Sequence, residues 1–410
     1  MTISTADDTR FKNVVILGGS CGGIGACHKL RELGGLPAPY RIVLIEQHSH
    51  MHYCYAFPRA AVHGGFEREL FAPYSNMFGG DEARGIVIQA TAKQMTPTHI
   101  ITDKGESIPY EYVIIATGTT GPEPTTLMSH TTKTAAIDTL KKYQARIAAA
   151  RDVVVVGGGA AGLEMAAEIK ESFPETNVTL VHSRDSYLPA YEPRLAEEAA
   201  SILDKLGVVR ILGKRVDLSG VPTWASSPSV STEEQTPFEV RATDGSSIVE
   251  KCDLIMMCTG MRPNSEALAT LTTAPLDKSG YINVLDTMQV ADAAFPNIFA
   301  IGNVAATDDV KMGYTAWRHG ALALTNIIKL IEGKNKDGAA VELEKRERAT
   351  PQMMLYMGMK DGAAQIVEEK SGQVMVVDGK MMAPYFTHNI GADRVWQWLG
   401  SEFKEENLDL

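Results

Sequence analysis

The stretch that decides the fold is Asp152-Val-Val-Val-Val-Gly157-Gly-Gly-Ala-Ala-Gly162. A run of β-branched residues leads into three glycines and then into residues 163–171, which have helical spacing. A second β-rich run follows at residues 177–182. Glycines Gly157, Gly159 and Gly162 stand where they let the backbone approach a pyrophosphate at a helix N-terminus. The stretch therefore predicts a βαβ unit that binds a dinucleotide.

The same order of elements occurs about 140 residues earlier. Asn13-Val-Val-Ile-Leu leads into Gly18-Gly-Ser-Cys-Gly-Gly23, residues 24–33 have helical spacing, and a β-rich run ends at Glu46. A carboxylate at the end of the second strand accepts hydrogen bonds from ribose hydroxyls. This copy departs from the pattern because Ser20 occupies the second glycine position, so its side chain must point away from the phosphate or bond to it. Two such units favour two bound dinucleotides over two packing turns.

The second strand of the later unit ends differently. His182 takes the place of the carboxylate, and Ser183 and Arg184 follow it. A 2′-phosphate would be repelled by an acid and attracted by a hydroxyl and a guanidinium. We therefore expect NADPH to be used at least as well as NADH. The alternative is a solvated strand end with incidental polar residues.

Length and charge narrow the class of protein. The chain has 410 residues, enough for two or three domains, and a formal charge of −11 that disfavours nucleic acid as a partner. No apolar run is long enough to span a bilayer, and the N-terminus lacks the pattern of a signal peptide. We expect a soluble, cytoplasmic protein with no transmembrane segment.

The five cysteines have no pair at the two-residue spacing of redox disulfides or zinc knuckles. A dithiol that stores two electrons is thereby excluded, and any redox centre must be a bound cofactor or one lone thiol. The ten histidines show no paired spacing for zinc or haem, and no nucleophile elbow is present. We therefore expect neither a metal site nor a hydrolase.

The rest of the chain suggests how the domains are arranged. Residues 85–91, 98–102 and 108–116 are strand-like and predict a β-meander, and residues 315–332 predict a helix with one apolar face. Residues 219–237 are predicted to be a long hairpin loop, and residues 336–350 a solvated linker. The Met-rich segments 352–359 and 375–386 are open to three interpretations: core strands, which we favour, a homodimer face, or the wall of an apolar substrate channel.

Several stretches resemble a known family. They are Met51-His-Tyr-Cys-Tyr-Ala-Phe-Pro-Arg-Ala-Ala-Val62, Ala116-Thr-Gly-Thr-Thr-Gly-Pro122, Gly162-Leu-Glu-Met-Ala-Ala-Glu-Ile169, Val178-Thr-Leu-Val-His-Ser183, Lys311-Met-Gly-Tyr314 and Met357-Gly-Met-Lys-Asp-Gly-Ala-Ala-Gln-Ile366. We also expect the two domains to be nested, with the first resuming after the second. Together with this layout, the stretches resemble the apoptosis-inducing-factor-like flavoproteins of the ferroptosis-suppressor (AMID) type. The resemblance covers most of the chain. It implies an α/β fold with two nested Rossmann-like dinucleotide-binding domains and a small α+β C-terminal domain.

The resemblance also implies domain bounds and cofactors. Residues 1–125 and 261–335 would bind FAD, residues 126–260 would bind NAD(P)H, and residues 336–410 would form the C-terminal domain. It places the FAD in the earlier unit and NADPH or NADH in the later one. The FAD-binding residues it implies are Gly18, Gly19, Ser20, Cys21, Gly22, Gly23, Glu46, Arg59, Thr117, Gly118, Gly302, Asn303 and Met312. The family has Asp where this chain has Asn303, so one charge-assisted contact to the ribitol chain is lost.

Three residues are candidates for catalysis by resemblance. Lys311 matches a position against the flavin ring, where a cation would stabilise the reduced flavin, although a surface lysine at a helix entrance is the alternative. Glu164 stands where related reductases contact nicotinamide, and an acid in the first helical turn also suits the helix dipole. Cys54 could be a reactive thiol facing the flavin, but buried cysteines are more often inert packing.

The function implied is an FAD-dependent NAD(P)H oxidoreductase that passes electrons to a quinone or another small organic acceptor. Such transfer depends more on stacking and alignment than on acid or base groups. Two alternatives remain open at this point. One is a flavin oxidase or dehydrogenase of a specialised-metabolite pathway. The other is a redox-weak nucleotide-binding sensor, which is suggested by the departures from the family pattern at Ser20 and Asn303.

Overall fold

The computed structural model describes residues 10–228, 236–333, 341–368 and 370–404. The part of the molecule that contains the first glycine loop, here called the first half, is built on a five-stranded parallel sheet with the order β19-β9-β1-β2-β5. These strands are β1 (Lys12–Leu17), β2 (Tyr40–Glu46), β5 (Gly85–Gln89), β9 (Tyr112–Ile115) and β19 (Ile298–Ala300). The part that contains the second glycine loop is called the second half. Because β19 lies beyond the whole second half in the sequence, the chain leaves this sheet and later returns to it. The nested layout predicted from the sequence is confirmed.

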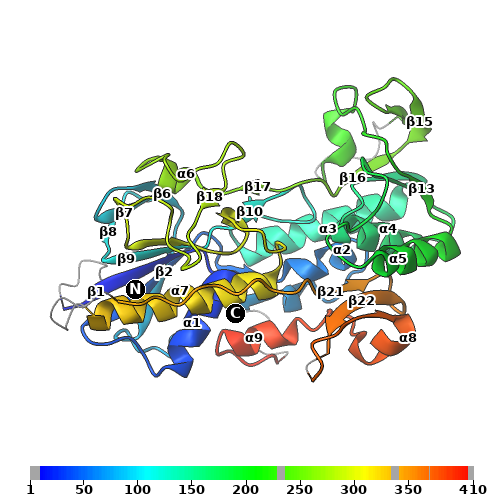
Figure 1. Cartoon of the computed structure of the whole chain (residues 1–410). Coiled ribbons are helices and arrows are strands. Elements are labelled where there is room, and N and C mark those ends of the chain that lie inside the picture. The colour runs from blue at the N-terminus through cyan, green and yellow to red at the C-terminus, as the bar shows by residue number, and fades with distance from the viewer. Residues whose placement is uncertain (1–9, 229–235, 334–340, 369, 405–410) are drawn as a thin grey trace.

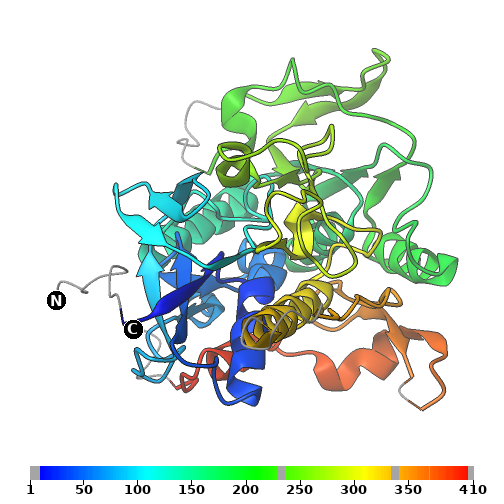
Figure 2. The same cartoon turned by 60° about the vertical axis from the view of Figure 1, so that its left-hand side comes forward.

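The second half repeats the arrangement on a smaller scale. Its parallel sheet has the order β13-β12-β11-β16, formed by β11 (Asp152–Val156), β12 (Asn177–Val181), β13 (Val209–Ile211) and β16 (Leu254–Met257). Helices α3 (Lys133–Ala149), α4 (Ala160–Ser172) and α5 (Pro193–Leu206) accompany it. In Figure 2 this half, in green, lies above the first half, in blue. The valines of β11 are buried because a parallel sheet is covered on both faces.

Two helices of the first half lie against each other along their length, α1 (Cys21–Glu32) and α7 (Gly313–Gly333) (Figures 1 and 2). Glycines permit this approach. A Cβ at Gly320 would lie 2.1 Å from the carbonyl oxygen of Gly22, and one at Gly25 would lie 2.5 Å from that of Trp317. The close contact brings the N-terminus of α7 beside the first glycine loop. The predicted helix 315–332 is confirmed within two residues at each end.

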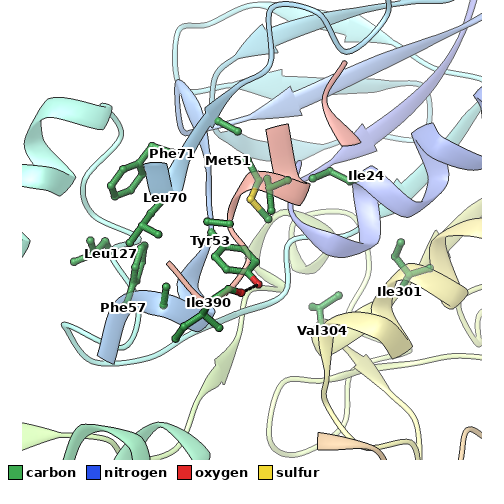
Figure 3. Packing of buried hydrophobic residues seen from close by; sticks show 14 of the residues in the cluster. Ile24, Met51, Tyr53, Phe57, Leu70, Phe71, Leu127, Ile301, Val304 and Ile390 are labelled. Carbon is green, nitrogen blue, oxygen red and sulfur yellow. Dashed lines mark hydrogen bonds between the residues drawn. The ribbon is translucent and has the colours of Figure 1, made fainter. Parts of the chain in front are cut away.

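The C-terminal segment forms a three-stranded antiparallel sheet of β21 (Met353–Tyr356), β22 (Gly362–Val367) and β23 (Val374–Asp378), followed by α8 (Gly379–Met382) and α9 (Asp393–Trp398). Trp396 is fully buried, and its ring N–H donates to the carbonyl oxygen of Glu69 at 2.8 Å. Tyr53 donates to the carbonyl oxygen of Ile390 at 2.9 Å, within the apolar packing shown in Figure 3. The end of the described chain thus docks on the first half.

The Met-rich segments of this domain divide between two environments. Met353, Met357 and Met382 are buried in the main core, which fits the core interpretation. Met354 and Met381 are exposed. The predicted linker lies partly outside the described residues, and its described part, 341–350, has no regular secondary structure.

The predicted meander requires a correction. Residues 85–89 form β5, which pairs in parallel with β2 as an edge of the main sheet. The predicted strand 108–116 splits into β8 (Ser107–Pro109) and β9, and β9 also joins the main sheet. The meander consists of β6 (Ala92–Met95), β7 (His99–Thr102) and β8. Strand propensity locates a strand but does not choose its neighbours, because pairing is decided by long-range packing.

Short elements connect these layers. They are β3 (His50–His52), α2 (Phe57–Ala60), β4 (Phe71–Pro73), β10 (Thr119–Thr120), β14 (Phe238–Arg241), β15 (Ser247–Cys252), β17 (Arg262–Pro263), α6 (Glu266–Ala269), β18 (Ile282–Asn283) and β20 (Ala305–Ala306). Strands β10 and β17 pair where the chain passes from one half to the other. The predicted loop 219–237 includes a short turn of 3-10 helix, and its residues 229–235 lie outside the described residues. Throughout the described ranges, every helix is too short or too polar to cross a membrane.

Candidate functional site

A large cavity opens at the carboxyl ends of the strands of the first sheet. Its volume is about 780 Å³, within the range of small-molecule and cofactor sites. Six separate segments contribute predicted site residues to it. Those that line it are Gly18, Ser20, Cys21, Gly22, Glu46, Cys54, Thr117, Gly118, Gly302, Asn303, Lys311 and Met312. The structure therefore brings together most of the residues predicted for the earlier unit, and the cavity runs from the glycine loop to the start of α7.

The first glycine loop is shaped by backbone contacts. Gly18 has φ +104°, and a Cβ there would lie 2.5 Å from the carbonyl oxygen of Ala116. A Cβ at Gly23 would lie 2.0 Å from the carbonyl oxygen of Gly18, so no other residue fits without a shift of the loop. Ser20 is exposed in extended conformation at the start of α1, and its side chain makes no capping bond. The departure at Ser20 therefore leaves the loop open.

Glu46 is held at the wall of the cavity next to this loop. Its carboxylate accepts the backbone N–H of Gly19 at 2.6 Å and that of His48 at 2.9 Å, and the ring of His48 lies 2.7 Å away. Burial by itself raises the pKa of Glu46, but these hydrogen bonds outweigh it and lower the pKa below its usual value. Gly19 and Gly23 do not line the cavity. They shape the loop that does.

The opposite end of the cavity is lined by the turn at Thr117 and Gly118 and by the start of α7. The side-chain amide of Asn303 donates to the Thr119 hydroxyl at 3.4 Å. Lys311 is partly buried, and its ammonium donates to the carbonyl oxygen of Ala305 and lies 5.4 Å from the centre of the Tyr281 ring. Burial lowers the pKa of Lys311. A cation of this kind at the end of an otherwise largely apolar cavity can stabilise developing negative charge.

Cys54 also lines the cavity. Burial, and to a smaller extent the neighbouring Cys21, raises the pKa of Cys54 to about 12, so its sulfur is a thiol near neutral pH. Cys21 is 3.4 Å from the hydroxyl of Tyr55. All five cysteines of the chain are free. This environment favours packing over nucleophilic chemistry for Cys54.

The second glycine loop has the same backbone geometry. Gly157 has φ +113°, and a Cβ there would lie 2.3 Å from the carbonyl oxygen of Cys258. A Cβ at Gly162 would lie 1.8 Å from the carbonyl oxygen of Gly157. In contrast, a Cβ at Gly159 would meet nothing within 4 Å. Because Gly159 is the counterpart of Ser20, this open space explains why the first loop tolerates a serine.

The three residues predicted at the end of β12, next to the second loop, differ in their burial and contacts. His182 accepts the backbone N–H of Gly158 at 3.1 Å through Nδ1, and its ring stacks on Tyr187 with centroids 5.7 Å apart. Burial and the nearby Arg184 lower the pKa of His182. Ser183 and Arg184 are exposed. His182 therefore supports the loop, while the hydroxyl and guanidinium next to it lie at the surface.

Glu164 lies outside the large cavity and in the second turn of α4, not in the first turn as predicted, because the helix already begins at Ala160. Its carboxylate accepts the backbone N–H of Tyr356, in β21, at 3.1 Å. Burial raises the pKa of Glu164 to about 8. The side chain therefore lies between the second glycine loop and the C-terminal domain, with a proton that it can exchange near neutral pH.

Arg59 is the one predicted FAD-binding side chain that the structure places in a different role. It is fully buried and does not line the cavity. Its guanidinium forms a 2.7 Å ion pair with Glu168 of α4 and donates to the carbonyl oxygens of Gly358 at 2.7 Å and Thr387 at 2.9 Å. These contacts join α2, α4 and the C-terminal domain, so Arg59 connects parts of the fold.

Sequence reasoning missed two tyrosines that complete the glycine loops. The Tyr74 hydroxyl donates to the carbonyl oxygen of Gly19 at 2.8 Å, and its ring would lie within 3 Å of a Cβ at Gly19. Tyr187 packs in the same way against Gly158. His52, which lines the cavity with Nε2 buried and without a partner in the described structure, was also missed. The glycine spacing does not signal these residues, because they lie outside the fingerprints themselves.

Two parallel sheets with matching glycine loops, one opening on a large cavity, define a two-dinucleotide oxidoreductase. Residues 12–322 match the pyridine nucleotide-disulphide oxidoreductase family, and the chain belongs to it. The predicted cofactors, FAD and NAD(P)H, are confirmed by this membership.

Individual proteins agree with this assignment. Ferroptosis suppressor protein 1 of Mus musculus is 32% identical over 374 residues, which cover 90% of this chain and 92% of that protein. Apoptosis-inducing factor homolog B of Dictyostelium discoideum is 25% identical over 87% of this chain and 89% of its own length. The predicted resemblance to this group is confirmed. The crystal structure of the sulfide:quinone oxidoreductase of Aquifex aeolicus has a TM-score of 0.70 at 18% identity, covers 95% of this chain and 92% of its own, and shares the fold.

Proposed function

We propose that this chain is an FAD-dependent NAD(P)H oxidoreductase that transfers an electron pair from nicotinamide to a quinone or a similar small organic acceptor. The observation that carries the proposal is the pair of glycine loops on one chain, of which the first opens on a cavity of about 780 Å³. FAD would occupy that cavity and supply a centre that accepts two electrons and passes them on. NAD(P)H would bind at the second loop.

The residues of the first cavity fit a flavin dinucleotide. The loop from Gly18 to Gly23 and the N-terminus of α1 would hold the pyrophosphate, and Glu46 would bind the ribose hydroxyls. Asn303 would contact the ribitol chain, with Lys311 and Met312 next to the ring system. Ser20 is exposed and makes no capping bond, and its counterpart Gly159 has open space around it, so the serine gives little support to the sensor alternative.

The residues of the second loop support use of NADPH. Ser183 and Arg184 are exposed at the end of β12, where a 2′-phosphate would lie, and no carboxylate follows that strand directly. Glu164 would contact the nicotinamide from the second turn of α4. We propose that Cys54 acts by packing and that Arg59 does not contact the nucleotide.

The quinone class is proposed from the relatives. The sulfide:quinone oxidoreductase is named for a quinone substrate, and it shares the fold over nearly the whole chain. Stopped-flow mixing of the FAD-loaded protein with NADPH and, separately, with NADH tests the first half of the proposal by bleaching of flavin absorbance. A panel of benzoquinones, naphthoquinones and ferricyanide then tests the second half. Protein that neither contains flavin nor regains it on incubation with FAD would refute the proposal. Rapid bleaching without turnover on any quinone would favour a metabolite dehydrogenase or oxidase.

A further inference from the structure

Each half of the molecule has a short Thr-Gly segment that lies against its glycine loop. The first is Ala116-Thr-Gly118, directly after β9, and the second is Cys258-Thr-Gly260, directly after β16. A Cβ at Gly18 would lie 2.5 Å from the first carbonyl oxygen of one segment, and a Cβ at Gly157 would lie 2.3 Å from that of the other. Any movement of a glycine loop is therefore felt by its Thr-Gly segment.

The two Thr-Gly segments are joined by a small antiparallel ribbon. Strand β10 follows the first segment directly, β17 follows the second after one residue, and the two pair with Thr119 opposite Pro263 and Thr120 opposite Arg262. Figure 1 shows this ribbon between the two halves. Thr120 and Arg262 are exposed, and a two-stranded ribbon is at best marginally stable in water by itself. A further contact is needed to hold the two segments together.

Asn264, the residue after β17, supplies that contact with all four of its polar groups. Its backbone N–H donates to the carbonyl oxygen of Gly118 at 3.0 Å, and its side-chain amide donates to that of Thr117 at 2.9 Å. Its backbone carbonyl accepts the Thr117 hydroxyl at 2.5 Å, and its side-chain oxygen accepts the Thr120 hydroxyl at 2.8 Å. We call these four hydrogen bonds the Asn264 clamp. An amide side chain suits the clamp because it offers a donor and an acceptor at once.

The clamp forms part of the wall of the cavity proposed for FAD. Its residues that line the cavity are Thr117, Gly118, Thr120 and Asn264. Asn303, the proposed ribitol contact, donates to the hydroxyl of Thr119 on the same ribbon. The segment 258–264 thus begins against the second glycine loop and ends at the wall of the first site. It connects the two proposed dinucleotide sites within seven residues.

We propose that Asn264 is a positioning residue that couples the two dinucleotide sites, an inference that rests on the proposed function. A nucleotide bound at the second glycine loop orders the second Thr-Gly segment, because that segment is packed against Gly157. The ribbon and the Asn264 clamp extend this order to Thr117 and Gly118. FAD then meets a wall that is already in place, part of the ordering cost is removed, and each ligand strengthens the binding of the other.

A clamp with a purely structural role would behave differently. Its loss would lower stability and weaken the binding of either nucleotide, whether or not the other nucleotide is bound. The coupling is instead the ratio of two affinities for one ligand, measured with the second site filled and empty. This ratio changes only if the clamp transmits the state of one site to the other.

Isothermal titration of NADP⁺ into FAD-loaded and FAD-free full-length protein measures this ratio without turnover. We expect wild type to bind NADP⁺ about fivefold more tightly when FAD is present, at the lower end of typical couplings. Asn264→Ala removes both side-chain bonds, and Asn264→Asp places a carboxylate oxygen, in place of the amide donor, next to the Thr117 carbonyl. In both variants the ratio should fall below about 1.5. FAD titrated with and without saturating NADP⁺ should give the same ratios, since coupling is reciprocal.

Two further variants define the origin of the effect. Asn177→Ala is the matched control, because Asn177 at the start of β12 also donates its amide between strands, to Asp152 at 2.8 Å, at the end of the sheet opposite the glycine loop. It should keep the wild-type ratio. Thr120→Val removes one bond of the clamp at an exposed position, and we expect a ratio of about two. Melting temperatures of the FAD-free proteins show which variants are folded, and Thr120→Val keeps the test open if the Asn264 variants are not.

The possible failures are separate from one another. A ratio near one in wild type would overturn the coupling, and so would a wild-type ratio retained in the folded clamp variants. If wild type bound neither NADP⁺ nor NADPH, with or without FAD, the proposed function itself would be refuted.

Discussion

The two glycine loops of this protein share their construction and differ in charge. In the first, the carboxylate of Glu46 accepts the N–H of Gly19 at 2.6 Å, and Tyr74 packs on that glycine. In the second, Nδ1 of His182 accepts the N–H of Gly158 at 3.1 Å, and Tyr187 packs on it. The residue at the strand end therefore stabilises the glycine loop in both halves. The charge of that residue differs between the halves, and this difference can select the ligand.

The helices that follow the loops differ at one matched position. Two residues after the last fingerprint glycine, α1 carries Gly25, which lets α7 approach, and α4 carries Glu164, which contacts β21. The first loop is enclosed by a helix of its own half, whereas the second faces the C-terminal domain. This contrast suits a retained prosthetic group in the first site and an exchangeable reductant in the second.

The largest expected effect tests whether the loops are equally tight. Gly162→Ala would place a Cβ 1.8 Å from the carbonyl oxygen of Gly157, and we expect a loss of about 3 kcal/mol in the free energy of unfolding, measured with urea. Gly159→Ser, which copies Ser20 of the first loop into open space, is the control and should change stability by less than about 0.5 kcal/mol. If the two substitutions lowered stability equally, position 159 would not be the open counterpart of Ser20, and the two loops would not be alike.

The next effect separates the two strand ends. Glu46→Ala removes the acceptor of two backbone N–H groups and the proposed ribose contact, and we expect FAD to bind about thirtyfold more weakly, equivalent to about 2 kcal/mol. The matched change, His182→Ala, should leave FAD affinity unchanged. Isothermal titration of the apoproteins with FAD gives both values. Weaker FAD binding in His182→Ala alone would reverse the assignment of the two sites.

A smaller effect is expected at the surface of the second site. Arg184→Ala should raise the Michaelis constant for NADPH about tenfold and leave that for NADH unchanged, because only NADPH carries a 2′-phosphate. Steady-state rates with a fixed acceptor provide the comparison. Arg194→Ala, on the exposed side of α5, is a control for loss of a surface charge. Equal changes with both nicotinamides would contradict the assignment of Arg184.

The smallest effect concerns Glu164. Its folded pKa of about 8 lies above its usual 4.5, so between these values the folded state keeps a proton that the unfolded state has lost. The free energy of unfolding should therefore fall as the pH rises, by about 1 kcal/mol between pH 7 and 8 from this group. Glu164→Gln should lack this component. Parallel urea titrations of both proteins at the two pH values would refute the expectation if their losses were the same.

Local sequence was informative wherever chain neighbours make the structure. The strands and helices around Gly18 and Gly157 lie within a few residues of their predicted bounds, because apolar periodicity and the glycine spacing act over one βαβ unit. The same spacing located the glycine loop and Glu46 at the cavity, whereas the other predicted lining residues came from the resemblance to the family. It also assigned Glu46 and His182 to equivalent positions, and the structure confirms that both bond to their loops.

Contacts between distant segments were beyond that reasoning. Strand β5 was assigned to the meander because its residues do not specify which edge they join. Arg59 follows a family motif, yet its partners Glu168, Gly358 and Thr387 lie 109 to 328 residues away, and these decide that it is buried in an ion pair. The Asn264 clamp was likewise not visible in the local sequence, because its side-chain partners lie 147 and 144 residues away.

By itself, the amino-acid sequence determined that two dinucleotide-binding units exist, which residues form their loops, and which strand end is acidic, since these follow from φ requirements and periodicity within short segments. The tertiary structure alone decided which loop is enclosed by a cavity, which predicted side chains reach it, and which segments meet at Asn264. The reason is that enclosure and burial depend on segments hundreds of residues apart, and packing places these together without a local signal.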